Sequence, residues 1–216
     1  METTFLSYIR RITVDLQTLA TVFTNNHMPS VVLKNKEDVL AYLREQIVDE
    51  STVAVGGSTT LFQFGIIDEL RSRNLNFYDR YAPGLTPAQI QEVFHHSFNA
   101  DAYIASANAV TLKGEIVNID RTGNRVAAMM YGPKKVYLIV SASKVVKDLD
   151  EARERIRRVA APKNAQRLNL KTPCVQTGYC MDCESPDRLC AFETVIKRQA
   201  IKDRIHVILV EEQGGF

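Results

Sequence analysis

Tryptophan is absent from the chain, cysteine is limited to four residues, and neither positive nor negative charge is in clear excess. Lys and Arg number 27 against 25 Asp and Glu, a formal charge of +2, which lacks the basic excess of a nucleic-acid-binding domain. No apolar run reaches the ~18 residues that a membrane-spanning helix needs. The first 22 residues also lack the pattern of a secretory signal, which is a basic start followed by an uninterrupted apolar segment. We therefore expect a cytoplasmic protein with no nucleic-acid partner and no membrane span.

The remaining sequence has the periodicities of an α/β fold. Short apolar runs that predict strands lie at 52–55, 75–78, 101–106, 115–119, 136–141 and 205–210. Helical spacing predicts intervening helices, with Asn35, Thr86 and Asp148 as their first caps and Pro162 as the end of the helix that begins at Asp148. Strands alternating with helices predict an open, mostly parallel sheet with helices on both faces.

Three parts are expected along the chain. Residues 1–25 form an amphipathic leading helix, and residues 26–162 form the α/β domain. Residues 163–216 form a cysteine-rich C-terminal excursion that returns to the sheet, because 171–189 has few core-forming residues. Within this last part, Ala191–Arg198 is predicted to be helical and 205–210 to be the returning strand.

All four cysteines lie within this excursion. Their spacing is Cys174-x5-Cys180-x2-Cys183-x6-Cys190, and the short central pair allows two thiolates to bind one cation while the outer two complete four ligands. Disulfides are uncommon in a reducing compartment, so metal binding is the favoured interpretation, ahead of a redox dithiol or buried inert cysteines. The wide outer spacings favour an iron–sulfur cluster, 4Fe–4S first, over zinc. We expect one of two roles for this metal centre. It either passes or senses electrons, or it stabilises a loop that is poor in apolar residues.

A second candidate site follows the buried strand 52–55. There Gly56, Gly57, Ser58, Thr59 and Thr60 open a helix, an arrangement in which backbone amides and hydroxyls can surround an anion. A tight turn with Ser58 as a plain helix cap explains the same residues. The sequence leaves these two interpretations open.

Four stretches in order resemble the lactate-utilisation (LUD) domain family. They are Val53–Leu61 (VAVGGSTTL), Asp101–Val110 (DAYIASANAV), Gly114–Asp120 (GEIVNID) and Gly123–Ala128 (GNRVAA), and the resemblance extends from about residue 20 to 146. The cysteine segment looks like one subgroup of that family. The resemblance implies a fold like that of ribose-phosphate isomerases and coenzyme A transferases.

The same resemblance implies a ligand cleft. Its first wall is the glycine-serine-threonine turn at 56–60, and Asn124 and Arg125 supply polar contacts, the Arg125 fork being suited to a carboxylate or phosphate. Its second wall consists of Asn108, Thr111, Gly114, Glu115, Asn118 and Asp120. The glutamate motif of coenzyme A transferases and the acidic and lysine motifs of pentose isomerases are absent, so the fold analogy supports a cleft for a small anionic ligand without supporting either reaction. A solvent-facing role for Glu115 is favoured over that of a general base.

Three functions follow as hypotheses. The leading one is an accessory or redox component of a lactate or small hydroxy-acid utilisation system, with a metal centre and with other subunits of an iron–sulfur oxidoreductase as partners. The second is an enzyme that binds a phosphorylated sugar or acyl-CoA ligand and holds a structural zinc. The third is a non-catalytic sensor or scaffold.

Overall fold

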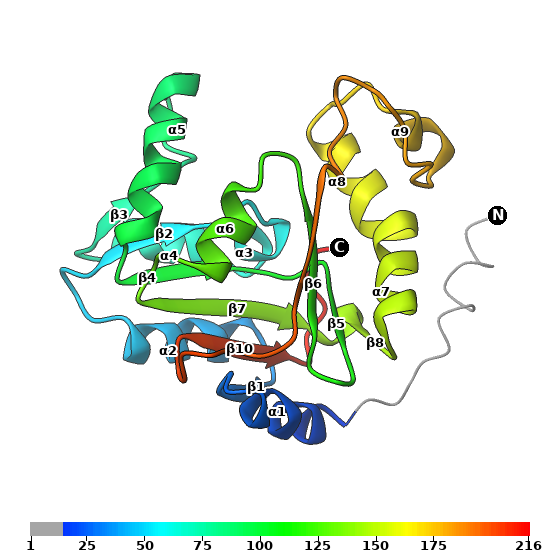
Figure 1. Cartoon of the computed structure of the whole chain (residues 1–216). Helices are drawn as coiled ribbons and strands as arrows, with labels where there is room; N and C mark the ends of the chain where they lie inside the picture. Colours follow the sequence, from blue (N-terminus) through cyan, green and yellow to red (C-terminus); the bar gives the residue numbers. More distant parts are fainter. Residues whose placement is uncertain (1–14) are drawn as a thin grey trace.

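The computed structural model describes residues 15–216 as two sheets with surrounding helices (Figure 1). The large sheet has the order β1-β10-β7-β4-β2-β3, and all its pairs are parallel. Its strands are β1 (Ser30–Leu33), β2 (Thr52–Val55), β3 (Asn76–Tyr78), β4 (Ala102–Ala105), β7 (Lys135–Ser141) and β10 (Ile205–Val210). The predicted α/β class with a mostly parallel sheet is confirmed.

Helices cover both faces of the large sheet. On one face α1 (Leu16–Asn25) and α6 (Asn124–Met130) pack in a core with Tyr103 and Leu138. On the other face α2 (Lys36–Gln46), α3 (Thr59–Gln63) and α4 (Ile66–Ser72) pack against Ile104 and Ile139. Strands buried on both faces read as nearly continuous apolar runs, which is why β7 and β10 were recognisable in the sequence. The part of the leading helix predicted within residues 1–14 lies outside the described residues.

The small sheet has the order β8-β5-β6-β9. Its strands are β5 (Ala109–Thr111), β6 (Ile116–Asp120), β8 (Val145–Val146) and β9 (Phe192–Ile196). A separate core forms between this sheet and the column of α7 (Leu149–Arg155), the π-helical turn η3 (Ile156–Ala160) and α8 (Ala161–Arg167), which is visible beside β5 and β8 in Figure 1. The cysteine segment begins after this column, at the short helix α9 (Pro173–Thr177).

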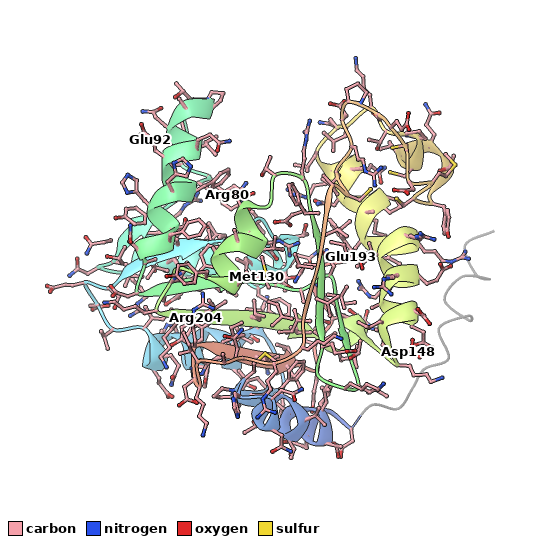
Figure 2. The ribbon with its side chains drawn as sticks, in the orientation of Figure 1. Arg80, Glu92, Met130, Asp148, Glu193 and Arg204 are labelled. Atoms are coloured by element: carbon pink, nitrogen blue, oxygen red, sulfur yellow. The ribbon has the colours of Figure 1, made fainter. Side chains whose placement is uncertain are left out.

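Local sequence signals explain several helix ends. Asn35 caps α2 and Asp148 caps α7, each by accepting a backbone N–H from three residues later. Thr86 and Gln89 form a reciprocal capping box at the start of α5 (Pro87–His96), which is followed by the turn η1 (Ser97–Asn99). The C-terminal end of α6 depends instead on a tertiary contact, because Arg204 donates to the carbonyls of Ala128 and Met129 from a distant part of the chain. Arg204 and the neighbouring Met130 are labelled in Figure 2.

Two local predictions were wrong. Ala191–Arg198 is not helical, because its residues 192–196 pair antiparallel with β6 as strand β9, and this tertiary pairing outweighs local preference. Pro162 does not end the helix that begins after Asp148. The wide turn η3, in which the Ala161 N–H bonds the Ile156 carbonyl, precedes it, and Pro162 lies in the first turn of α8, where a missing N–H costs little.

Among residues 15–216, no helix is both long and apolar enough to cross a bilayer.

Candidate functional site

A small polar cavity lies where strands of the large sheet end. Because carboxyl ends of parallel strands share one edge, the residues after β2, β4, β7 and β10 meet there. The cavity has a volume of about 60 Å³, which suits a small ion or acid better than a drug-sized molecule. Its lining comes from both sheets and from α6, α8 and the C-terminal end: Gly57, Ser58, Thr59, Thr60, Ser106, Ala107, Asn108, Asp120, Arg125, Lys144, Asn164 and Phe216. In Figure 1 the marked C-terminus ends beside β6 and α3.

Arg125 is fixed at one wall of the cavity. Its guanidinium donates to Asp120 Oδ1 from Nε (3.0 Å) and from Nη2 (2.8 Å), and both side chains are buried. It also donates to the side-chain oxygens of Asn118 and Asn108, at 3.0 Å each, and to the backbone carbonyl of Ser106 at 2.8 Å. These bonds hold the planar fork in a single orientation.

Lys144 also lines the cavity. It ends the turn η2 (Ala142–Lys144) after β7, and only 2% of the residue is exposed. Its Nζ donates to Thr60 Oγ1 at 2.8 Å and to Ser106 Oγ at 3.0 Å. Burial lowers the pKa of Lys144 well below its usual value, and the charges of Arg155 and Arg125 lower it further. These surroundings therefore favour the uncharged form of the amine.

Arg155 of α7 adds a third basic side chain behind the cavity. It is buried and donates to two backbone carbonyls, those of Asn108 (2.5 Å) and Ser143 (3.2 Å). Burial lowers the pKa of Arg155 to about 10, so it stays a cation at neutral pH. Asp120 is thus the one buried carboxylate among three buried basic side chains around the cavity, counting the described residues. The surroundings favour an anion.

The turn at 56–60 provides the remaining wall. Ser58 stands at the N-cap position of α3, yet its side chain makes no capping hydrogen bond, so the plain-cap interpretation does not account for it. Gly56 lies behind Arg125, where an added Cβ would be 2.9 Å from Arg125 Cγ. Gly57 to Thr60 line the cavity directly.

The other residues that the resemblance placed in a cleft do not all meet there. Asn108 and Asp120 line the cavity, and Asn118 supports it through Arg125. Asn124 lines a neighbouring groove between α5 and α6 instead. Glu115 lies in the turn between β5 and β6, where its carboxylate accepts from Thr111 Oγ1 at 2.9 Å. Gly114 of the same turn is packed against Asn26 at the end of α1, away from the cavity lining.

Sequence reasoning missed five lining residues: Ser106, Ala107, Lys144, Asn164 and Phe216. For Ser106 and Lys144 a signal existed, since each follows a buried strand, β4 or β7, at the edge where α/β proteins bind ligands. Asn164 and Phe216 reach the cavity from α8 and the C-terminal end, which no local pattern indicates.

The four cysteines are free thiols. Cys180 Sγ and Cys190 Sγ lie 3.6 Å apart, whereas Cys174 is buried on α9 beside Thr172 Oγ1. The pKa of the Cys190 thiol is raised to about 11, mainly by burial and to a smaller extent by the hydrogen bond with Cys180. Within residues 15–216, no three His, Cys, Asp or Glu side chains gather closely enough to hold a metal ion. The four-thiolate metal centre therefore stays a prediction from the cysteine spacing.

A family model described as the LUD domain matches residues 16–210, nearly the whole of the described chain. The chain belongs to the LUD domain family. This confirms the resemblance carried by the four sequence stretches. No protein of curated function matches this LUD protein.

Solved structures similar to it include two with different degrees of likeness. A DUF162 family protein from Deinococcus radiodurans has a TM-score of 0.51 and 14% identity, over 90% of this chain and 95% of that chain. A variant of the decarboxylase AibA/AibB has a TM-score of 0.35 and 18% identity, over 82% of this chain and 86% of that chain. At such low identity the first likeness shows the fold alone.

Proposed function

We propose that this LUD protein binds a small organic anion of the 2-hydroxy acid class, such as lactate, as a component of a lactate-utilisation system. The family is linked to lactate utilisation, and the cavity supplies the chemistry. The observation that carries the proposal is the excess of buried guanidinium groups, those of Arg125 and Arg155, over the single buried carboxylate of Asp120. A buried charge without a counter-charge is costly, and a bound carboxylate lowers that cost.

The polar lining fits the rest of such a ligand. The hydroxyls of Ser58 and Thr59 and the amide of Asn164 can pair with carboxylate and hydroxyl oxygens. A volume of about 60 Å³ leaves room for several non-hydrogen atoms, because one water needs about 10–15 Å³ by the same kind of measure.

The test is thermal and chemical unfolding of the whole protein with lactate and with lactamide, which has the same shape without the charge. Lactate at a hundred times its dissociation constant should stabilise the fold by ~2.7 kcal/mol, and lactamide should not. Equal effects of the two compounds, or none from either, contradict the proposal. Stabilisation by sugar phosphates or a CoA ester in place of lactate favours the second hypothesis, an enzyme for those ligands.

No electron-transfer step is assigned to the cysteine segment, because no three of its described sulfur atoms converge. The metal centre and the iron–sulfur partner subunits are separate predictions from the cysteine spacing and the family.

A further inference from the structure

We propose that the amine of Lys144 forms an imine with the carbonyl carbon of a small 2-oxo acid held in the cavity. The inference rests on the proposed function, because the carboxylate of this ligand occupies the same anion site. A 2-oxo acid is the oxidised counterpart of a 2-hydroxy acid, and it differs in carrying the electrophilic carbon that an amine can attack.

The step needs no oxidant or reductant. The nitrogen lone pair forms a C–N bond to the carbonyl carbon, and a proton passes from nitrogen to oxygen to give a carbinolamine. The C–O bond then breaks, and the oxygen leaves as water with the second nitrogen proton. An uncharged amine is required, because an ammonium has no lone pair.

The hydrogen bonds around Nζ orient that lone pair. Ser106 Oγ donates its own hydrogen to the Ile139 carbonyl at 2.6 Å, so it accepts from Lys144. Thr60 Oγ1 donates toward Ser106 Oγ at 3.4 Å and likewise accepts from Lys144. A neutral amine has two N–H donors and one lone pair. With both donors engaged by these hydroxyls, the lone pair is the position left for a reaction partner.

Charge and burial favour the uncharged form of the amine. Within residues 15–216 no carboxylate forms an ion pair with Lys144, and the charged groups that act on it are the guanidiniums of Arg155 and Arg125. Desolvation is the largest cause of its lowered pKa. Such an environment is how proteins make a lysine nucleophilic at neutral pH.

Space beside the amine depends on Gly215. A Cβ at this position would collide with Thr60 Oγ1 and come within 2.8 Å of Lys144 Nζ. The glycine, held by its N–H to Gln63 Oε1 at 2.5 Å, lets the backbone pass over the amine without a side chain filling the site.

The experiment traps the imine on the native protein. The whole chain is incubated at neutral pH with pyruvate and sodium cyanoborohydride, digested, and mapped by mass spectrometry. We expect the reduced adduct on Lys144 and at least ten-fold less on Lys147, whose side chain is 68% exposed and serves as the internal control. Added lactate should slow labelling of Lys144 alone. Equal labelling of the two lysines, or of Lys147 only, overturns the inference.

Two further results separate this inference from the proposed function. If lactate stabilises the protein but pyruvate leaves no adduct on Lys144, the imine is wrong and the anion site stands. If neither occurs, both fail. Lys144→Met should abolish the adduct and Lys147→Met should keep it. Because removal of a buried amine can alter the fold, the mapping on the unchanged chain decides the question.

Discussion

The guanidinium of Arg125 and the carboxylate of Asp120 form a buried ion pair through two hydrogen bonds to the same oxygen, Asp120 Oδ1. The second oxygen, Oδ2, accepts the backbone N–H of Val126 at 3.1 Å, so Asp120 also fastens the first turn of α6. One carboxylate therefore positions both the arginine that lines the cavity and the helix that carries it.

Asp120→Ala is expected to destabilise the fold by about 3–5 kcal/mol, because it leaves the Arg125 charge buried without a partner. Urea unfolding measures this change. The matched control is Glu193→Ala, which breaks the exposed ion pair between Arg153 and Glu193 and should cost about 1 kcal/mol or less. Glu193, on β9, is labelled in Figure 2. Equal losses of stability in the two variants would contradict a larger contribution from the buried ion pair.

Gly56→Ala is expected to cost about 1–3 kcal/mol and to weaken lactate binding. Its Cβ would lie 2.9 Å from Arg125 Cγ and 3.0 Å from Tyr103 Oη, so the arginine must move. Gly57→Ala is the neighbouring control for stability alone, because its nearest contact is an ordinary 3.5 Å, to Arg80 Nη1, although Gly57 lines the cavity. Unfolding of both variants and lactate titration of Gly56→Ala test this. An unchanged Gly56→Ala protein contradicts the close packing.

Ser58→Ala should weaken anion binding while leaving stability nearly unchanged, because the Ser58 hydroxyl caps no backbone N–H. Thr86→Ala should do the reverse. Its hydroxyl is part of a capping box at the start of α5, away from the cavity, and its loss is expected to cost about 1 kcal/mol. Lactate titration and urea unfolding of the two variants give this cross-comparison. A stability loss in Ser58→Ala would restore the plain-cap interpretation.

The cysteine spacing predicts that protein purified without oxygen carries iron and visible absorbance, or else about one zinc without colour. Metal analysis of the native chain and of Cys183→Ser, in which we expect the metal to be lost, tests this. Binding has to draw Cys174 and Cys183 toward the Cys180–Cys190 pair, which is already close at 3.6 Å. Four reactive thiols and no bound metal under those conditions would contradict the prediction.

His206 predicts a loss of stability in mild acid. Burial lowers the pKa of His206 below its ordinary value of 6.5, the Lys135 charge lowers it further, and Asp203 opposes the shift. Its ring lies 5.2 Å from that of Tyr137, and Nε2 donates to the Asp203 carbonyl. Below pH 6.5 the unfolded chain therefore takes up a proton that the folded chain resists, so stability falls as the pH drops. The free energy of unfolding of the natural chain, relative to that of His206→Gln, should decline from pH 7 to pH 5; a constant difference contradicts this.

Local sequence patterns predicted much of the fold. Buried runs such as 136–141 and 205–210, together with caps such as Asn35, indicated the elements of a parallel α/β sheet, because a strand covered on both faces must be apolar throughout. The glycine-serine-threonine turn was likewise visible, because backbone amides and hydroxyls at the start of a helix can surround an anion. Arg125 was indicated only by the family resemblance.

Tertiary structure alone decided the remainder. The strand at 192–196 exists because β6 supplies its hydrogen-bond partners, and nothing within those five residues requires it. Lys144 looked like an ordinary lysine after a strand, and only contacts with Thr60, 84 positions away, and with Ser106, 38 positions away, bury it without a counter-charge. Its protonation depends on desolvation and on neighbouring charges, which come from segments that meet only in the folded chain.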